Sequence, residues 1–224
     1  MKPILEIIAL TAADARAAQD GGADRIELVT AMAQAGLTPS VETFVQVRAA
    51  ADLPVRVMLR NQDGYGHSAG LAASAAALRA AGADQFVLGL LDDAGAVDIA
   101  SLPDLDGCPW TFHRALDHAA DRAAALRVIR TLPGVDCVLT GGSPAGVDAG
   151  LDVLLAEART GAGPRILAGG GLQPQHVAPL AAAGVDAFHV GSAVRRGGWD
   201  TPVDAELVAQ WRSWIDAAPA GTSR

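Results

Sequence analysis

The chain has 224 residues, of which 50% are hydrophobic, so it can bury one large core, and we expect a single domain over residues 1–224. A formal net charge of -8 without a lysine or arginine cluster argues against a surface for nucleic acid or for an anionic membrane. No apolar run approaches the roughly 18 residues of a membrane span, and the first expected strand begins almost at Met1, which together favour a cytoplasmic protein without a signal peptide.

One short layout recurs four times: a glycine, then alanine or valine, then aspartate, then an apolar run. The copies begin at Gly22, Gly82, Gly134 and Gly184. Their spacings are 60, 52 and 50 residues, and each copy predicts a helix that ends at the glycine before a buried strand. A second series of apolar runs interleaves with the first and opens at Pro3, Pro54, Pro109 and Pro164. Two interleaved series of four predict eight strands.

In chain order, we expect the strands at residues 4–8, 25–29, 55–60, 85–90, 110–113, 137–140, 165–168 and 187–190. Helices are expected between them, the first two capped by Thr11 and Ser40 and ending at residues 20 and 51. The later helices are expected at residues 71–81, 117–131, 147–160, 174–183 and 202–217. Residues 98–105 suggest a short or irregular helix, the polar loop 61–70 suggests a lid, and we expect residues 218–224 to fray.

Alternating strands and helices with a repeat of about two strand-helix units predict a parallel (β/α)8 TIM barrel. A doubly wound open sheet is the alternative. The even repeat favours closure, because an open sheet gives its edge and central strands different surroundings. In a barrel, the loops after the strands build the functional site.

Aligning the even strands places Glu27, Val87, Leu139 and His189 at one structural position. If this position faces the barrel interior, Glu27 and His189 converge there while the two apolar residues fill the core. A carboxylate within an apolar strand is costly to bury, which favours a functional role over an isolated polar residue.

On the odd strands, His113 falls level with Met58, and Arg60 lies two residues further along the same face. Glu6 has the opposite parity, so either the first strand is shifted by one residue or Glu6 lies outside the pocket; we favour the shift. Arg114 and Asp117 follow His113 directly, and Asp117 could cap a helix while it fixes Arg114 or His113.

Glycine turns follow the last three strands, and their backbone amides predict a site for a small anionic ligand such as a phosphate. The residues are Gly141, Gly142, Gly170, Gly171, Gly191 and Ser192. The sequence has a single lysine, Lys2, which would lie outside the barrel and so excludes Schiff-base aldolase chemistry.

Several strings, in order along residues 5–195, together resemble the CutC family. They are Arg25-Ile26-Glu27-Leu28, Gly36-Leu37-Thr38-Pro39-Ser40, Val57-Met58-Leu59-Arg60, Thr111-Phe112-His113-Arg114-Ala115-Leu116-Asp117, Leu139-Thr140-Gly141-Gly142, Gly169-Gly170-Gly171 and Phe188-His189. The resemblance implies a cytoplasmic TIM barrel linked to copper homeostasis, and a homo-oligomer such as a dimer or tetramer. It carries over the polar positions Glu6, Glu27, Arg60, His113, Arg114, Asp117 and His189.

The chain departs from this family where copper ligands would be expected. Members commonly have cysteine after the glutamate of the first two strands, whereas this chain reads Glu6-Ile7-Ile8 and Glu27-Leu28-Val29. Cu(I) prefers thiolate and thioether ligands, and the remaining candidates, Cys108 and Cys137, fall near the start of adjacent strands, away from the expected pocket.

Two hypotheses follow. The resemblance implies a copper-binding or copper-handling protein, with copper as the possible cofactor. The polar residues favour an isomerase, epimerase or lyase acting on a small phosphorylated or carboxylated metabolite, with Glu27 or His113 moving a proton and the arginines holding negative charge.

Overall fold

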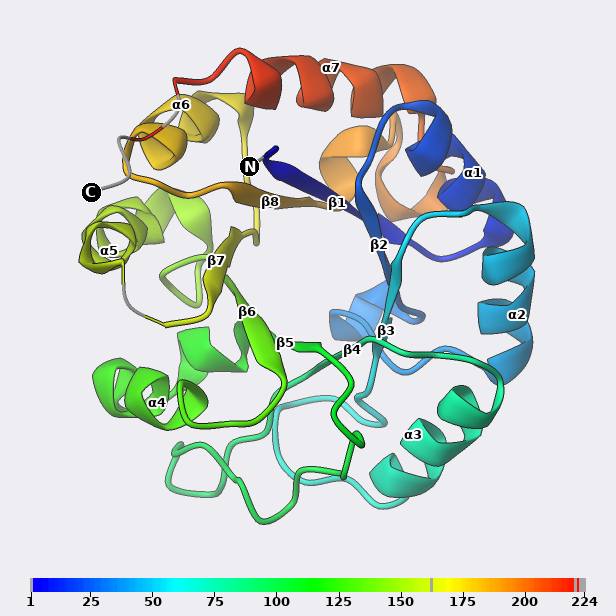
Figure 1. The fold of residues 1–224 in the computed structure, drawn as a ribbon, viewed down its shortest axis with the longest axis vertical. Coiled ribbons are helices and arrows are strands. Elements are labelled where there is room, and N and C mark those ends of the chain that lie inside the picture. Colours follow the sequence, from blue (N-terminus) through cyan, green and yellow to red (C-terminus); the bar gives the residue numbers. More distant parts are fainter. Residues whose placement is uncertain (1, 162, 220, 222–224) are drawn as a thin grey trace.

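The computed structural model describes residues 2–161, 163–219 and 221, and within these ranges eight parallel strands close into a barrel in sequence order. Helices surround the barrel in a ring (Figure 1). This confirms the predicted (β/α)8 TIM barrel and excludes the open sheet. The strands are β1 (Ile4–Ala9), β2 (Arg25–Leu28), β3 (Val55–Met58), β4 (Phe86–Leu88), β5 (Trp110–Phe112), β6 (Val135–Thr140), β7 (Arg165–Ala168) and β8 (Ala187–Val190).

The helices are α1 (Ala12–Asp20), α2 (Val41–Ala50), α3 (Leu71–Ala80), α4 (Arg122–Ile129), α5 (Val147–Thr160), α6 (Pro174–Ala182) and α7 (Ala205–Asp216). Thr11 and Ser40 cap α1 and α2 as predicted, each accepting a hydrogen bond from a backbone amide of the first turn. The predicted frayed tail lies mostly outside the described residues, because of its members only 218, 219 and 221 are described.

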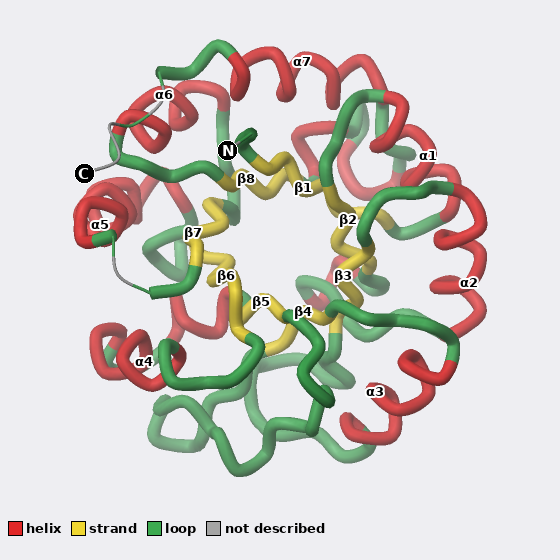
Figure 2. The backbone as a smooth tube through the Cα atoms, viewed as in Figure 1, coloured by secondary structure: helices red, strands yellow, loops and turns green. Residues whose placement is uncertain are grey.

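Two expected helical segments differ from the structure: the one at residues 98–105 is absent, and the one expected from residue 117 begins later, at Arg122. Residues 98–105 form turns and irregular chain, so no helix of the described residues covers the barrel between β4 and β5, where Figure 2 shows only loop. Asp117 does not begin a long helix, because residues Arg114–His118 form a 3₁₀ turn and Asp121 caps α4 four residues later. The reason is that the Asp117 carboxylate is occupied elsewhere, as described below.

Side chains alternate across each strand, and the outward set forms the main hydrophobic core against the helices. Leu5 and Ile7 of β1, for example, are fully buried in one cluster with Ala15 of α1 and Val208 of α7. The inward set is different: Glu6, Arg25, Glu27 and other polar side chains alternate with these positions and are also buried. The barrel interior therefore combines buried polar side chains with small apolar clusters such as Ile8, Met58 and Val87.

The base of the barrel is the end at which the strands begin. Here Lys2 donates to Asp24 across 2.6 Å, and Arg212 of α7 donates to the same carboxylate across 2.7 Å. No helix of the described residues is long and apolar enough to span a membrane.

Candidate functional site

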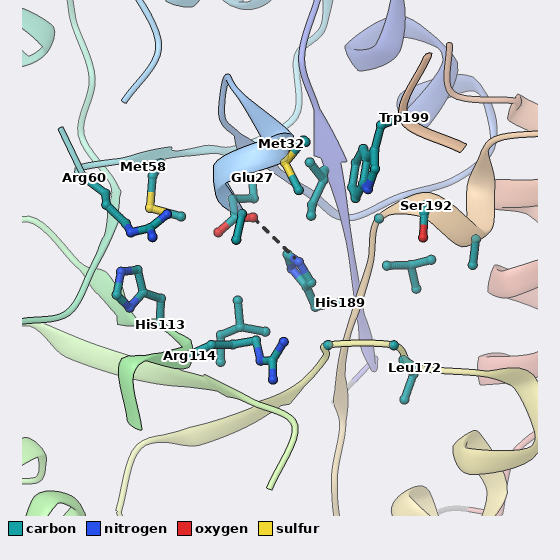
Figure 3. Close-up of a pocket in the computed structure, with 18 of the residues that line it drawn as sticks. Glu27, Met32, Met58, Arg60, His113, Arg114, Leu172, His189, Ser192 and Trp199 are labelled. Atoms are coloured by element: carbon teal, nitrogen blue, oxygen red, sulfur yellow. Dashed lines mark ion pairs between the residues drawn. The ribbon is translucent and has the colours of Figure 1, made fainter. Parts of the chain in front are cut away.

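A pocket of about 250 Å³ lies at the C-terminal ends of the strands. Figure 3 shows Glu27 and His189 pointing toward each other at its centre, with Arg60, His113 and Arg114 along one side. Ser192 and Trp199 lie on the other side in the same view. This is the end of the barrel at which the sequence places the site.

Glu27 and His189 converge as the strand alignment predicts, with Glu27 Oε2 and His189 Nε2 3.6 Å apart. Leu139, from the same aligned set, also lines the pocket, and Val87 packs inside the barrel beside Ile8 and Met58. The polar pair and the apolar pair therefore occupy the same level of the interior.

Glu6 points into the barrel, but it lies beneath the pocket instead of lining it. Its Oε1 is 2.7 Å from Nδ1 of His189, and its Oε2 accepts from Nε of Arg25 across 2.5 Å. The backbone of Glu6 is in register with both Arg25 and His189. The first strand is thus shifted by one residue relative to the proline alignment, and Glu6 supports His189 from below.

The pKa values of the two glutamates are shifted in opposite directions. Burial raises the pKa of Glu27 to about 7, opposed by the nearby His189 and assisted by the negative charge of Glu6. Burial alone would also raise the pKa of Glu6, but Arg25 and the hydrogen bond to His189 hold that pKa at about 2. The interior therefore holds one permanent carboxylate and one carboxyl group that titrates near neutral pH.

His113 is an uncharged hydrogen-bond donor. Burial, and after it the positive charge of Arg60, lowers the pKa of His113 to about 3. Its Nδ1 accepts from the backbone amide of Ala115 across 3.2 Å, so the neutral ring carries its hydrogen on Nε2. This Nε2 is buried without a partner among the described residues, as is Oε1 of Glu27.

Arg60 lines the pocket, yet most of its N–H groups bind loop backbone. Nε donates to the carbonyl of Gly64 across 2.8 Å, and Nη1 donates to the carbonyls of Gln34 and Gly36. Tyr65, in the same loop as Gly64, stacks near His113 with ring centroids 5.4 Å apart. Arg60 thus fixes the loop 61–70 over His113, and little of its guanidinium remains for a ligand.

Arg114 is held on two sides and open on the third. Its Nε donates to Asp117 across 2.9 Å, and Nη2 donates to the carbonyls of Ser143 and Pro144. Asp117 is fully buried and also accepts from the amide of Gly141. Nη1 of Arg114 has no hydrogen-bond partner among the residues that the structure describes. Asp117 therefore positions Arg114, which is the second role the sequence suggested for it.

The glycine turns divide into two groups. The amides of Gly141 and Gly142 donate to Asp117 and to Thr140 Oγ1, so the structure contradicts their predicted role as anion donors. The remaining predicted positions line the pocket: Gly170, Gly171, Gly191 and Ser192. A Cβ added at Gly170 would lie 2.7 Å from Cζ of Arg114, so the missing side chain makes room for that guanidinium.

Neither cysteine lines the pocket. Cys137 is buried lower in the barrel, with Sγ 3.9 Å from Nη2 of Arg25, and burial raises the pKa of its thiol. Cys108 precedes β5 and is half-buried.

Several residues of the barrel interior were not predicted from the sequence. Met32 and Trp199 line the pocket from short 3₁₀ turns, and no pattern in the sequence indicates that they reach it. Arg25 and Arg56 were detectable in principle, because they lie two residues before Glu27 and Met58 and therefore share their inward face.

The model of one protein family, described as the CutC family, matches residues 3–194 of the chain. Curated relatives bear the name "family protein CutC". The relative from Chromobacterium violaceum is 36% identical over 218 residues, covering 88% of this chain and 87% of its own length. The relative from Klebsiella pneumoniae is 34% identical over 195 residues, covering 83% of this chain and 78% of its own length.

Two solved structures share the fold. The putative copper homeostasis protein CutC from Streptococcus agalactiae has a TM-score of 0.75 at 22% identity, covering 84% of this chain and 98% of that one. A thiamine phosphate pyrophosphorylase from Pyrococcus furiosus has a TM-score of 0.57 at 18% identity, with 95% of each chain covered. At these identities the structures support the barrel alone. The family model and the curated relatives show that the chain belongs to the CutC family.

Proposed function

We propose that this CutC-family barrel is an enzyme that moves a proton on a small phosphorylated or carboxylated metabolite, as an isomerase, epimerase or lyase does. One observation carries the proposal: Glu27 Oε1 and His113 Nε2 line the same pocket, and both are buried without a partner among the described residues. Unpaired buried polar atoms cost free energy, which a ligand that pairs with both would recover.

Glu27 is suited to act as the general base. Its pKa of about 7 lies near a neutral working pH, where a base is both available and strong enough to accept a proton. Glu27 lines the pocket, and its unpaired Oε1 is the oxygen left free to accept a carbon-bound hydrogen of the ligand.

His113 is suited to polarise a carbonyl group. Because its Nδ1 accepts from Ala115, the Nε2–H is available to donate to a carbonyl oxygen of the ligand. When Glu27 removes a proton from the carbon beside that carbonyl, the electron pair of the broken C–H bond moves toward the oxygen. The Nε2–H of His113 then stabilises the negative charge that develops there.

An acidic group of the ligand would bind beside these two residues. Nη1 of Arg114 provides a fixed cation with N–H groups that bind no described residue, and Gly171 and Ser192 line the same pocket. Charge-assisted hydrogen bonds from a guanidinium suit either a phosphate or a carboxylate. The cavity of about 250 Å³ limits the ligand to a small metabolite.

The test is a thermal-unfolding scan of the metal-free protein with inorganic phosphate, several sugar phosphates, and small 2-oxo and 2-hydroxy acids. A ligand that binds only the folded state raises the melting temperature. Each metabolite that does so is then incubated with the protein in D2O, and proton NMR follows the loss of its C–H signal. Exchange catalysed by the protein supports the proposal, and a panel without a shift or exchange contradicts it.

A link to copper homeostasis is the second candidate, because the relative from Streptococcus agalactiae carries that description. The thioethers of Met32 and Met58 and the imidazoles of His113 and His189 line the pocket, and such groups suit copper. However, in residues 2–161, 163–219 and 221 no group of three or more His, Cys, Asp or Glu side chains is placed to hold a metal ion. The copper candidate therefore rests on the two thioethers together with the imidazoles, and no step above involves copper.

The same scan separates the two candidates when anaerobic Cu(I), Cu(II) and Zn(II) are added to the panel. A shift with Cu(I) that disappears in Cys108→Ser or Cys137→Ser, or in Met32→Leu, would support copper binding and locate it. A shift with the phosphate or carboxylate compounds and none with copper supports the enzyme. A cytoplasmic location and a homo-oligomer, a dimer or tetramer, remain predictions from the family resemblance.

A further inference from the structure

Four buried ionisable side chains form a line from the base of the barrel to the pocket. Nε of Arg25 donates to Oε2 of Glu6 across 2.5 Å, and Oε1 of Glu6 is 2.7 Å from Nδ1 of His189. Nε2 of His189 is then 3.6 Å from Oε2 of Glu27. All four side chains are more than nine-tenths buried. The line ends at Glu27, which lines the pocket and whose Oε1 is buried without a partner among the described residues.

The charges around this line come from adjacent strands. His189 on β8 faces Glu6 on β1 and both Glu27 and Arg25 on β2. Beneath His189, the positive charge of Arg56 on β3 also helps to lower the pKa of Glu6, and the Cys137 thiol of β6 lies near Glu6. On the other strands beside His189, its neighbours are Leu139 and Gly169, which do not titrate.

This arrangement fixes which ring nitrogen of His189 carries hydrogen. Burial by itself raises the pKa of Glu6, but Arg25 and His189 hold it at about 2, so Glu6 is an ionised carboxylate that can only accept. His189 must therefore donate from Nδ1 to Glu6. In the neutral ring, Nε2 then presents its lone pair toward Oε2 of Glu27.

We infer that Glu6 is a positioning residue that makes His189 the proton partner of Glu27. The inference rests on the proposed function, in which Glu27 is the base. After Glu27 takes a proton from the ligand on Oε1, its carboxyl group rotates so that this O–H meets Nε2 of His189 and gives it the proton. The carboxylate of Glu27 is restored and an imidazolium forms between two carboxylates. The number of protons and the total charge of the pair do not change, and the reverse transfer returns the proton.

The 3.6 Å separation is longer than a hydrogen bond, so the Glu27 carboxyl group must turn toward His189 for the transfer. Glu6 is 0% exposed and His189 is 6% exposed, which keeps the stored proton away from bulk water. Return of the proton to the ligand is therefore expected to compete with exchange into solvent, which suits an isomerase or epimerase.

The test is the titration of the His189 ring nitrogens by ¹⁵N NMR in the full chain without ligand, assigned with His189→Gln. In the wild type, Nδ1 should stay protonated from pH 5 to 9 while Nε2 titrates. In Glu6→Gln the pKa of His189 should fall by about one unit or more, because one of the two carboxylates beside the imidazolium is gone. A neutral wild-type ring that carries its hydrogen on Nε2 and not on Nδ1, or an unchanged titration in Glu6→Gln, would overturn the inference.

Asp136→Asn is the matched control, because it also removes a carboxylate from an interior arginine, Arg56, but it does not touch His189. Its His189 titration should equal that of the wild type. If Glu6→Gln does not fold because Arg25 is left unpaired, ¹³C NMR of the Glu27 carboxyl group in His189→Gln replaces it. The Glu27 pKa should rise by about one unit or more without its cationic neighbour, and an unchanged value would contradict the inference.

These titrations need no metabolite, so their outcome is independent of whether the pocket turns over a substrate. A wild-type titration as expected, with no exchange of any compound in the panel, would contradict the proposed function and leave the pairing of Glu6, His189 and Glu27 intact. Exchange by Glu6→Gln at the wild-type rate and with the wild-type pH profile would do the reverse.

Discussion

The barrel interior contains charged side chains at both ends, but those at the base are paired with partners, whereas polar atoms at the pocket end are not. At the base, Arg56 and Arg165 bind both oxygens of Asp136 and Asp186 respectively. At the pocket end, Glu27 Oε1 and His113 Nε2 have no partner among the described residues. Paired charges in a poorly hydrated interior can hold strands in place, whereas unpaired polar atoms mark the place where a ligand would bind. Four measurements test whether the two ends of the barrel differ in this way.

The largest expected effect is on proton transfer. Glu27→Gln should lower deuterium exchange into a bound metabolite by about 100-fold or more, because the amide cannot accept the proton. Glu42→Gln, the same change at an exposed position of α2, should leave exchange unaltered. Proton NMR in D2O measures both rates, and exchange by Glu27→Gln at the wild-type rate would show that the unpaired carboxyl group is not the base.

The second effect is on stability against pH. The pKa of Glu27 is about 7 in the folded chain against 4.5 as its ordinary value, so the folded state binds the proton more tightly. This contribution is fully present below pH 4.5 and is lost as the pH rises to about 7. Relative to the wild type, Glu27→Gln should therefore gain up to about 3 kcal/mol between pH 4.5 and 8. Urea unfolding at a series of pH values measures the difference, and parallel curves for the two proteins would contradict it.

The third effect concerns the base. Asp136→Asn should lower the free energy of unfolding by about 2 kcal/mol, because Arg56 is buried and loses its carboxylate; the half-exposed position of Asp136 keeps the loss below that of a fully buried pair. Ligand affinity at the pocket should change less than about twofold. Urea unfolding measures the change in stability, and calorimetric titration measures the change in ligand affinity. If Asp136→Asn lost ligand affinity without a change in the free energy of unfolding, the base and the pocket would not act independently.

The smallest effect distinguishes two neighbouring glycines. Both have positive φ, 93° at Gly170 and 74° at Gly171, so alanine strains the backbone at either position. Only at Gly170 would the new Cβ meet the Arg114 guanidinium, at 2.7 Å, while nothing lies within 4 Å at Gly171. Gly170→Ala should therefore weaken anion binding about tenfold, a loss of about 1.4 kcal/mol, and Gly171→Ala should weaken it less. Equal losses would remove Arg114 from the anion site.

The fold was largely predictable from the sequence because its signals are local and repeated. Glycine at a helix end and a short apolar run define each strand, and a threonine or serine before α1 and α2 defines their starts. The segment 98–105 failed because composition alone does not distinguish irregular chain from a weak helix. The predicted helix start at Asp117 was wrong because its carboxylate accepts from Arg114 within the same 3₁₀ turn and from the amide of Gly141 after β6.

Of the site, only the residues on strands were predictable, because the alternation of side chains along a strand fixes which of them point inward. Alignment of repeats brought Glu27 to His189, since strand geometry fixes which side chains point inward. The role of Arg60 depends instead on the path of the loops, whose carbonyls of Gln34 and Gly64 take up its N–H groups. No spacing in the sequence indicates such contacts, and the same holds for the place of Trp199 in the pocket.

The position of Lys2 has a practical consequence. The sequence contains a single lysine, and its Nζ binds Asp24 at the N-terminal ends of the strands, opposite the pocket. Reagents that couple to a lysine side chain can therefore attach the protein to a sensor surface or a dye at one place only. Every attached molecule would then present the open mouth of its barrel to the solution, in a uniform orientation.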